Sequence, residues 1–177
     1  MIRVLSKFIL KKIICWEVIG SLPLNKKYVI AVVPHSSYFD LVIAVLIRTY
    51  SGLKIKFIGK KELFNPITSF FFKFLGGIPV DRSKNTNIVD EVVSLFDQKE
   101  IEILAIAPEG TRKEVKKWKS GFYYIALNAN LPILMVSFDY MKKEVNINDK
   151  FFPSGNFEND IRKLEDLVMH VVIRNKN

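Results

Sequence analysis

Apolar residues along this chain form short continuous runs, and between the runs they recur at spacings of three and four residues. The continuous runs predict buried strands of a parallel sheet, over residues 28–33, 54–58, 78–80, 101–107 and 131–138, and residues 144–148 fit a further edge strand. The spaced segments predict helices over residues 40–50, 64–75, 86–98, 119–128 and 160–173. This alternation predicts an α/β domain with a mostly parallel sheet flanked by helices, and 177 residues suit a single domain spanning 1–177.

Residues 1–20 predict an amphipathic helix. Its apolar positions recur at helical spacing, at Val4, Leu5, Phe8, Ile9 and Ile13, with Arg3, Lys7, Lys11 and Lys12 between them. These charges interrupt every apolar stretch, so the segment neither spans a bilayer nor reads as a signal peptide. Two interpretations stay open: a helix that lies on a membrane surface, and a helix that packs on the protein's own core.

The composition is basic and rich in phenylalanine. Lys and Arg outnumber Asp and Glu by 27 to 18, giving a formal charge of +9, which attracts anionic lipids, phosphorylated substrates, an acidic carrier protein or nucleic acid, or simply maintains solubility. The charges are scattered and no aromatic–basic motif accompanies them, which argues against nucleic acid. Some of the 14 Phe are candidates for contact with lipid: the cluster around Phe70 and Phe74 fits an acyl tunnel, a membrane-facing wedge or a core helix.

Cysteine and histidine are too few for most metal sites. The single cysteine, Cys15, excludes an intrachain disulfide framework, and we expect it to be buried. Because the only histidines are His35 and His170, we expect no metal site.

Three polar segments follow predicted strands: residues 35–40, 81–82 and 109–112. In parallel sheets, chemistry gathers at the carboxyl ends of the strands. His35 lies in a strand-to-helix turn and Asp40 enters the following helix, so the carboxylate can reach back to the imidazole and leave its other nitrogen to accept a proton. No GxSxG nucleophile motif occurs, which favours direct activation of a substrate hydroxyl. Taken alone, a His-x4-Asp spacing also arises by chance.

Each of the other two segments, taken alone, is weaker evidence for a functional site. Arg82 ends the GGIPVDR segment and fits a phosphate clamp, but also a surface turn with Asp81. In APEGTR, Glu109 can accept hydroxyls, Gly110 permits close approach of the backbone, and Arg112 can bind phosphate; an ordinary polar loop explains the same residues.

The order and spacing of these segments are more specific than any one of them. His-x4-Asp, GGIPVDR, APEGTR and a strand led by Pro132, with GKKEL at 59–63, resemble the glycerophospholipid acyltransferase family, whose best-known members are the lysophosphatidic acid acyltransferases. The resemblance covers about residues 28–140, the motif-bearing core. The chain departs from the family in carrying Pro34 where relatives often have Asn, and in its short length.

The resemblance implies roles for individual residues. His35 would deprotonate the acceptor hydroxyl and Asp40 would orient it, while Pro132 would shape the acyl-donor side. Acceptor binding would fall to Ser37, Arg82, Glu109, Gly110, Thr111 and Arg112, with the two arginines on phosphate.

The function implied is transfer of an acyl group to a lysophospholipid, most simply 1-acylglycerol-3-phosphate. The donor would be acyl-CoA or acyl carrier protein, used as cosubstrate, with no bound cofactor and no covalent acyl-enzyme. The enzyme would lie peripherally on the cytoplasmic side of the cell membrane, at an anionic surface. Two alternatives stay open: a lysolipid acceptor with a non-glycerol headgroup, such as an amino acid, and a catalytically silent basic domain that binds membrane or nucleic acid.

Overall fold

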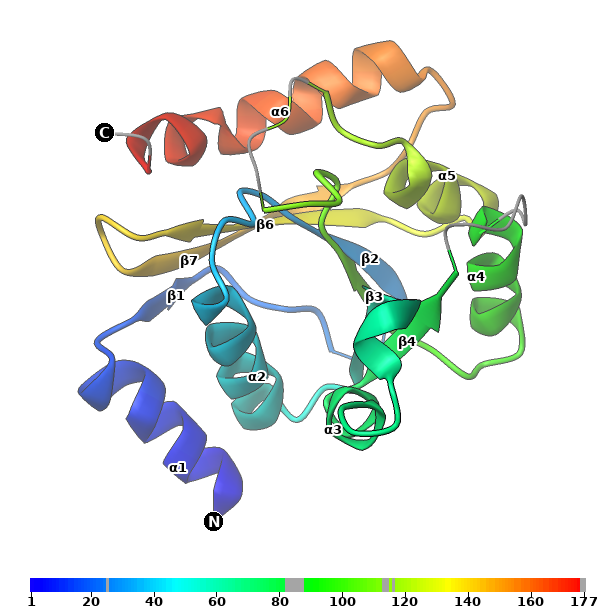
Figure 1. Cartoon of the computed structure of the whole chain (residues 1–177). Helices are drawn as coiled ribbons and strands as arrows, with labels where there is room; N and C mark the ends of the chain where they lie inside the picture. The colour runs from blue at the N-terminus through cyan, green and yellow to red at the C-terminus, as the bar shows by residue number, and fades with distance from the viewer. Residues whose placement is uncertain (25, 82–87, 113–114, 116, 176–177) are drawn as a thin grey trace.

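The fold is built on one seven-stranded sheet in the order β1-β7-β6-β2-β5-β3-β4 (Figure 1). The structure is a computed structural model that describes residues 1–24, 26–81, 88–112, 115 and 117–175. The strands are β1 Glu17–Ile19, β2 Tyr28–Val32, β3 Ile55–Lys60, β4 Gly77–Val80, β5 Ile103–Ile106, β6 Ile133–Asp139 and β7 Glu144–Phe151. The strands from β6 to β4 are mutually parallel, and β7 pairs antiparallel with β6. The predicted α/β class with a mostly parallel sheet is confirmed.

Helices cover both faces of the sheet (Figure 1). They are α1 Ile2–Phe8, which continues as the π-helix η1 Ile9–Ile13, α2 Phe39–Ser51, the 3₁₀ helix η2 Lys61–Phe64, α3 Ser69–Phe74, α4 Ile88–Asp97, α5 Gly121–Asn128 and α6 Phe157–Arg174. Strand β2 is apolar throughout because both of its faces are buried. Val29 and Ala31 pack toward α4, α5 and α6, whereas Tyr28 and Ile30 pack toward α2 and η1. The predicted end of α2 is also confirmed, because Gly52 takes the left-handed conformation (φ 72°) that closes the helix.

The N-terminal helix presents most of its apolar residues to solvent. Along α1 and η1 only Ser6 and Leu10 are buried, while the exposed apolar residues are Ile2, Val4, Leu5, Phe8 and Ile13. Leu10 and Trp16 dock the segment on the core beneath α2. Among the described residues, no helix combines the length and apolar character that a bilayer crossing requires.

The helix predicted over residues 1–20 is too long. It ends at Ile13, Cys15 turns the chain with a left-handed φ of 57°, and residues 17–19 form β1 instead. The backbone of β1 pairs in parallel with β7 from Glu17 to Ile19, which satisfies the outer side of β7. The strand predicted at 144–148 is therefore longer than expected and is not at the edge of the sheet. Cys15 is exposed, against the expectation that it is buried.

The helix predicted over residues 64–75 is divided. The side chain of Asn65 accepts hydrogen bonds from the backbone N–H groups of Ile67 and Thr68, both at 3.0 Å, which forms a turn between η2 and α3. Helix α3 then exposes its aromatic side chains: Phe70 is 82% and Phe74 is 74% exposed. Neither the acyl-tunnel nor the core-helix interpretation of this cluster fits that exposure.

Candidate active site

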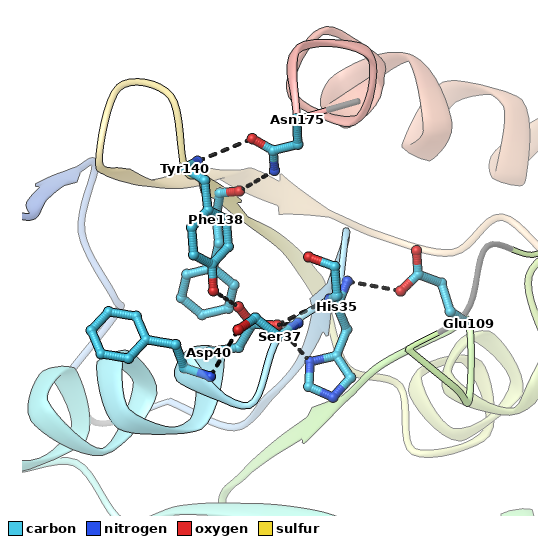
Figure 2. Close-up of polar contacts among 9 residues, drawn as sticks. His35, Ser37, Asp40, Glu109, Phe138, Tyr140 and Asn175 are labelled. Atoms are coloured by element: carbon cyan, nitrogen blue, oxygen red, sulfur yellow. Dashed lines mark hydrogen bonds and ion pairs between the residues drawn. The ribbon is translucent and has the colours of Figure 1, made fainter. Parts of the chain in front are cut away.

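The sheet order brings two of the three predicted segments together. Strands β2 and β5 are neighbours, so the loops that leave their carboxyl ends lie side by side. The backbone N–H of His35 donates a hydrogen bond to Glu109 Oε2 at 2.8 Å (Figure 2). Burial raises the pKa of Glu109, although this bond and the nearby imidazole oppose the shift. Glu109 therefore holds the position of the His35 backbone.

The imidazole of His35 contacts the carboxylate of Asp40. His35 Nδ1 lies 3.0 Å from Asp40 Oδ2, and the side chains are 33% and 3% exposed, respectively. The expectation that Asp40 reaches back to the imidazole is confirmed. A carboxylate at Nδ1 favours the tautomer that carries its proton there, which leaves Nε2 unprotonated and able to accept a proton.

Asp40 is held on both of its oxygens. Oδ2 also accepts hydrogen bonds from the backbone N–H groups of Ser36 and Ser37, each at 3.1 Å. Oδ1 accepts one from the hydroxyl of Tyr140, which lies in the turn after β6. The hydroxyl of Ser37 accepts a bond from the N–H of Phe39 at 3.0 Å, so it stabilises the start of α2. Tyr140 was missed by sequence reasoning because it lies 100 residues from Asp40 and belongs to no motif.

An apolar cavity adjoins this pair. It has a volume of about 200 Å³ and lies between α2 and the sheet. His35 and Asp40 are among its lining residues, and the others are mostly aliphatic, including Ile30, Val32, Leu41, Ala44, Val45 and Val136. The cavity therefore places hydrocarbon surface directly beside a partly exposed imidazole.

The loop after β5 places Arg112 near the loop that carries His35. Gly110 has a left-handed φ of 65°, and an added Cβ would lie 3.0 Å from the side chain of Lys119, so a glycine fits here best. Thr111 and Arg112 follow as exposed residues. The guanidinium carbon of Arg112 lies 3.5 Å from the ring centroid of Tyr38, three residues after His35.

The remaining predicted positions are not all at this site. Arg82 lies outside the described residues. Its neighbour Asp81 forms an ion pair with Lys61 at 3.1 Å, after β4 and β3 rather than beside His35. Pro132 precedes β6, and its carbonyl accepts the N–H of Val29 at the start of β2. Parallel pairing puts Pro132 at the end of the sheet opposite His35, so the structure does not bring it beside the His35–Asp40 pair, and its role on the acyl-donor side stays a prediction.

Metal-binding groups do not gather here. Within the described part of the chain, no three His, Cys, Asp or Glu residues are arranged so that they could hold a metal ion.

Comparison with known proteins finds a matching family and a similar fold. A family model described as Acyltransferase matches residues 15–139. The fold is similar to the crystal structure of the 1-acyl-sn-glycerophosphate (LPA) acyltransferase PlsC from Thermotoga maritima, with a TM-score of 0.69 and 21% sequence identity, over 99% of this chain and 78% of that chain. No curated protein matches the sequence.

Proposed function

We propose the function from one premise: the chain belongs to the acyltransferase family. The proposed reaction moves a fatty acyl group from acyl-CoA or acyl carrier protein to the hydroxyl of a lysophospholipid, with 1-acylglycerol-3-phosphate as the acceptor. The observation that carries the proposal is the contact of His35 Nδ1 with buried Asp40 at 3.0 Å, beside an apolar cavity.

The proposed chemistry is direct attack with general-base assistance. Nε2 of His35 takes the proton of the acceptor hydroxyl as its oxygen attacks the thioester carbonyl carbon. The tetrahedral intermediate then breaks its carbon–sulfur bond, and the leaving thiolate takes the proton from the imidazolium. Asp40 orients the ring and stabilises the imidazolium, and such a base contributes a rate factor of about 10²–10⁴.

The cavity under α2 suits the hydrocarbon part of the substrates. Burial contributes about 0.8 kcal/mol for each CH₂ removed from water, so an acyl chain is a favourable occupant of a site with this lining. An acyl chain whose carbonyl end lies at His35 would extend between α2 and the sheet. Long-chain donors are then expected to bind more tightly than acetyl donors.

The headgroup is proposed to lie on the outer side of His35. Arg112 is exposed and stacks on Tyr38, which lies in the loop that carries His35, so a phosphate held by Arg112 would lie close to the acceptor hydroxyl. Glu109 and Gly110 belong to the loop that carries Arg112, and Glu109 binds the backbone of His35. We propose Arg82 as a second phosphate ligand from its sequence motif alone.

The enzyme is proposed to bind the membrane surface on which its acceptor resides. Helix α1 exposes Leu5 (53%) and Phe8 (54%) beside Lys7, and η1 adds Lys11 and Lys12. Exposed apolar residues flanked by lysine are the pattern of an interfacial helix: each basic residue near an anionic surface contributes about 1 kcal/mol, and apolar insertion adds affinity that salt does not screen.

Sedimentation with vesicles tests this location. The wild type is expected to pellet with phosphatidylglycerol vesicles, and high salt should weaken the binding without abolishing it. The double variant Leu5→Ser/Phe8→Ser should lose the salt-resistant part. Phe152→Ser is the matched control, because Phe152 is 64% exposed after β7. Equal binding by all three proteins would contradict a role for the N-terminal helix.

An acceptor screen tests the reaction itself. Purified protein is incubated with radiolabelled acyl-CoA or acyl carrier protein and with lysophosphatidic acid, an amino-acid-headgroup lysolipid or no acceptor. Labelled phosphatidic acid supports the proposal. Product only with the amino-acid lysolipid would establish the non-glycerol alternative. No product with any acceptor, together with salt-sensitive membrane or DNA binding, would favour a silent binding domain.

A further inference from the structure

Tyr140 occupies a position next to Asp40 that the family motifs do not include. Its hydroxyl donates a hydrogen bond to Oδ1 of Asp40, while Oδ2 faces the imidazole of His35 (Figure 2). Three segments far apart in the sequence therefore meet on one carboxylate: the β2–α2 loop, the first turn of α2 and the β6–β7 turn.

The backbone and the ring of Tyr140 are each fixed by other parts of the chain. Its N–H donates to Asn175 Oδ1 at 3.0 Å, and Asn175 Nδ2 donates to the carbonyl of Phe138 at 2.6 Å. Asn175 directly follows α6, so the end of the last helix holds the turn that carries Tyr140 (Figure 2). The Tyr140 ring packs edge-to-face on Trp16, with ring centroids 5.1 Å apart.

We propose that Tyr140 is a positioning residue for the His35–Asp40 pair, one that fixes the rotation of the Asp40 carboxylate and shares its charge. The inference rests on the proposed function, in which His35 is the base. It gives the turn after β6 a part in the reaction, although the residues predicted to act on the acceptor all lie before residue 113.

The Asp40 carboxylate is almost fully buried. Among the described residues, the Tyr140 hydroxyl is the donor to Oδ1, so its loss would leave this buried oxygen without that bond, and the carboxylate would gain by rotating toward other donors. Burial, and then the bond to Asp40, raise the pKa of Tyr140 well above its usual range. The phenol therefore stays protonated at neutral pH and continues to donate its hydrogen bond to Asp40.

Sharing the charge also sets how strongly Asp40 attracts a proton on His35. A carboxylate that accepts a bond on Oδ1 is a weaker partner for the imidazolium on Oδ2. Charged groups near the pair include Glu109 beside His35, Arg112 on the ring of Tyr38, and Asp139 next to Tyr140, which is paired with Arg174. All of these remain when only the Tyr140 hydroxyl is removed.

The test compares Tyr140→Phe with Tyr123→Phe. Tyr123 is a matched control, because its hydroxyl donates to buried Asp160 at 2.8 Å on the opposite face of the sheet. Tyr140→Phe should lower kcat for acyl transfer about 10- to 100-fold, the loss that corresponds to one hydrogen bond to a charged group, with KM nearly unchanged. Tyr123→Phe should leave kcat within about twofold, a change of less than about 0.5 kcal/mol.

A second readout needs no substrate. The chain has two histidines, so the ring signals of His35 can be followed by NMR and assigned with His35→Ala. In Tyr140→Phe the ring-proton and ring-nitrogen signals of His35 at neutral pH should shift, because the Asp40 carboxylate that contacts Nδ1 has lost the bond that fixes its rotation, while Tyr123→Phe should match the wild type. If wild type transfers no acyl group but this shift occurs, the proposed function fails and the positioning role stands. Unchanged His35 signals with unchanged kcat, or equal effects of both variants, would overturn the inference.

Discussion

Asp40 and Asp160 are both buried carboxylates bonded to a tyrosine hydroxyl, but they lie on opposite faces of the sheet and end in different surroundings. Asp160 accepts from Tyr123 at 2.8 Å and from Ser154, whose N–H lies 2.6 Å away. Those partners join the first turn of α6 to α5 and to the loop after β7. Every bond of Asp160 is made to a group that only holds the fold together.

Asp40 differs in one partner. After Tyr140 and the backbone N–H groups, its remaining contact is the imidazole of His35, which is 33% exposed and lines the cavity under α2. The comparison teaches that a buried, well-bonded carboxylate does not by itself mark an active site. What distinguishes the candidate active site is that the hydrogen-bond network of the carboxylate includes a titratable side chain that a ligand can reach.

Removal of His35 should lower the turnover of the enzyme more than any other single substitution considered below. His35→Ala is expected to lower kcat by about 10²–10⁴-fold, because the general base is lost, while the free energy of unfolding stays close to that of the wild type. Steady-state acyl transfer and urea denaturation on one preparation measure both quantities. Turnover close to the wild-type value in the folded variant would remove His35 from the mechanism.

Asp160→Asn should lower the stability of the fold and leave turnover nearly unchanged. The amide is uncharged and offers one oxygen where the carboxylate has two, so the bonds from Ser154 and Tyr123 lose their charge-assisted strength and the variant should lose about 2–3 kcal/mol of stability at neutral pH. Burial alone would raise the pKa of Asp160, but the bonds from Ser154 and Tyr123 hold it below its usual range.

The sign of that shift predicts a pH dependence. A depressed pKa stabilises the fold above the unfolded value of about 3.9, and this contribution is lost as the pH falls through the folded value. The stability gap between wild type and Asp160→Asn should therefore be constant near neutrality and shrink below about pH 4. Denaturation curves at several pH values measure it, and a gap that grows on acidification would contradict the assignment.

Glu109 permits a smaller test of how the site is held. Glu109→Ala leaves the His35 N–H without its acceptor and should lower kcat/KM about tenfold, equivalent to about 1.4 kcal/mol. Glu109→Gln keeps a carbonyl oxygen in place and should retain most activity. If Gln and Ala are equally impaired, the negative charge of Glu109, rather than its hydrogen bond, is what the site requires.

Arg112→Lys should have the smallest effect. Lys loses the planar fork and the stacking on Tyr38, so KM for lysophosphatidic acid should rise about two- to fivefold with kcat nearly unchanged. Monoacylglycerol, which lacks the phosphate, is the control acceptor and should show no change. An equal rise in KM for both acceptors would place the phosphate elsewhere.

Several of these positions followed from the sequence, for reasons that are local. The apolar run at β2 predicts a buried parallel strand, and five residues of spacing after it place Asp40 within reach of His35. The resemblance also pointed to Glu109, whose side chain binds the backbone N–H of His35.

Other features depend on long-range pairing that no local pattern encodes. Tyr140 and Asn175 reach the site only because β6 lies next to β2 and α6 returns across the sheet. The short strand β1 forms because β7 offers an unpaired edge, so its residues continue an amphipathic pattern that in isolation predicts helix. The outward orientation of α1 was left open by sequence, since periodicity shows that a helix has an apolar face but not which way that face points.

The central claim is tested most directly by measuring kcat and the free energy of unfolding for Asp40→Asn and Asp160→Asn side by side. Asp40→Asn removes the negative charge that stabilises the imidazolium, while its amide oxygen can still face His35 and the N–H groups of Ser36 and Ser37, so kcat for acyl transfer to lysophosphatidic acid should fall at least about 10²-fold. Asp160→Asn should keep kcat within about threefold and lose the larger share of stability. A folded Asp40→Asn enzyme with wild-type turnover, or an equal loss of turnover in both variants, would contradict the account.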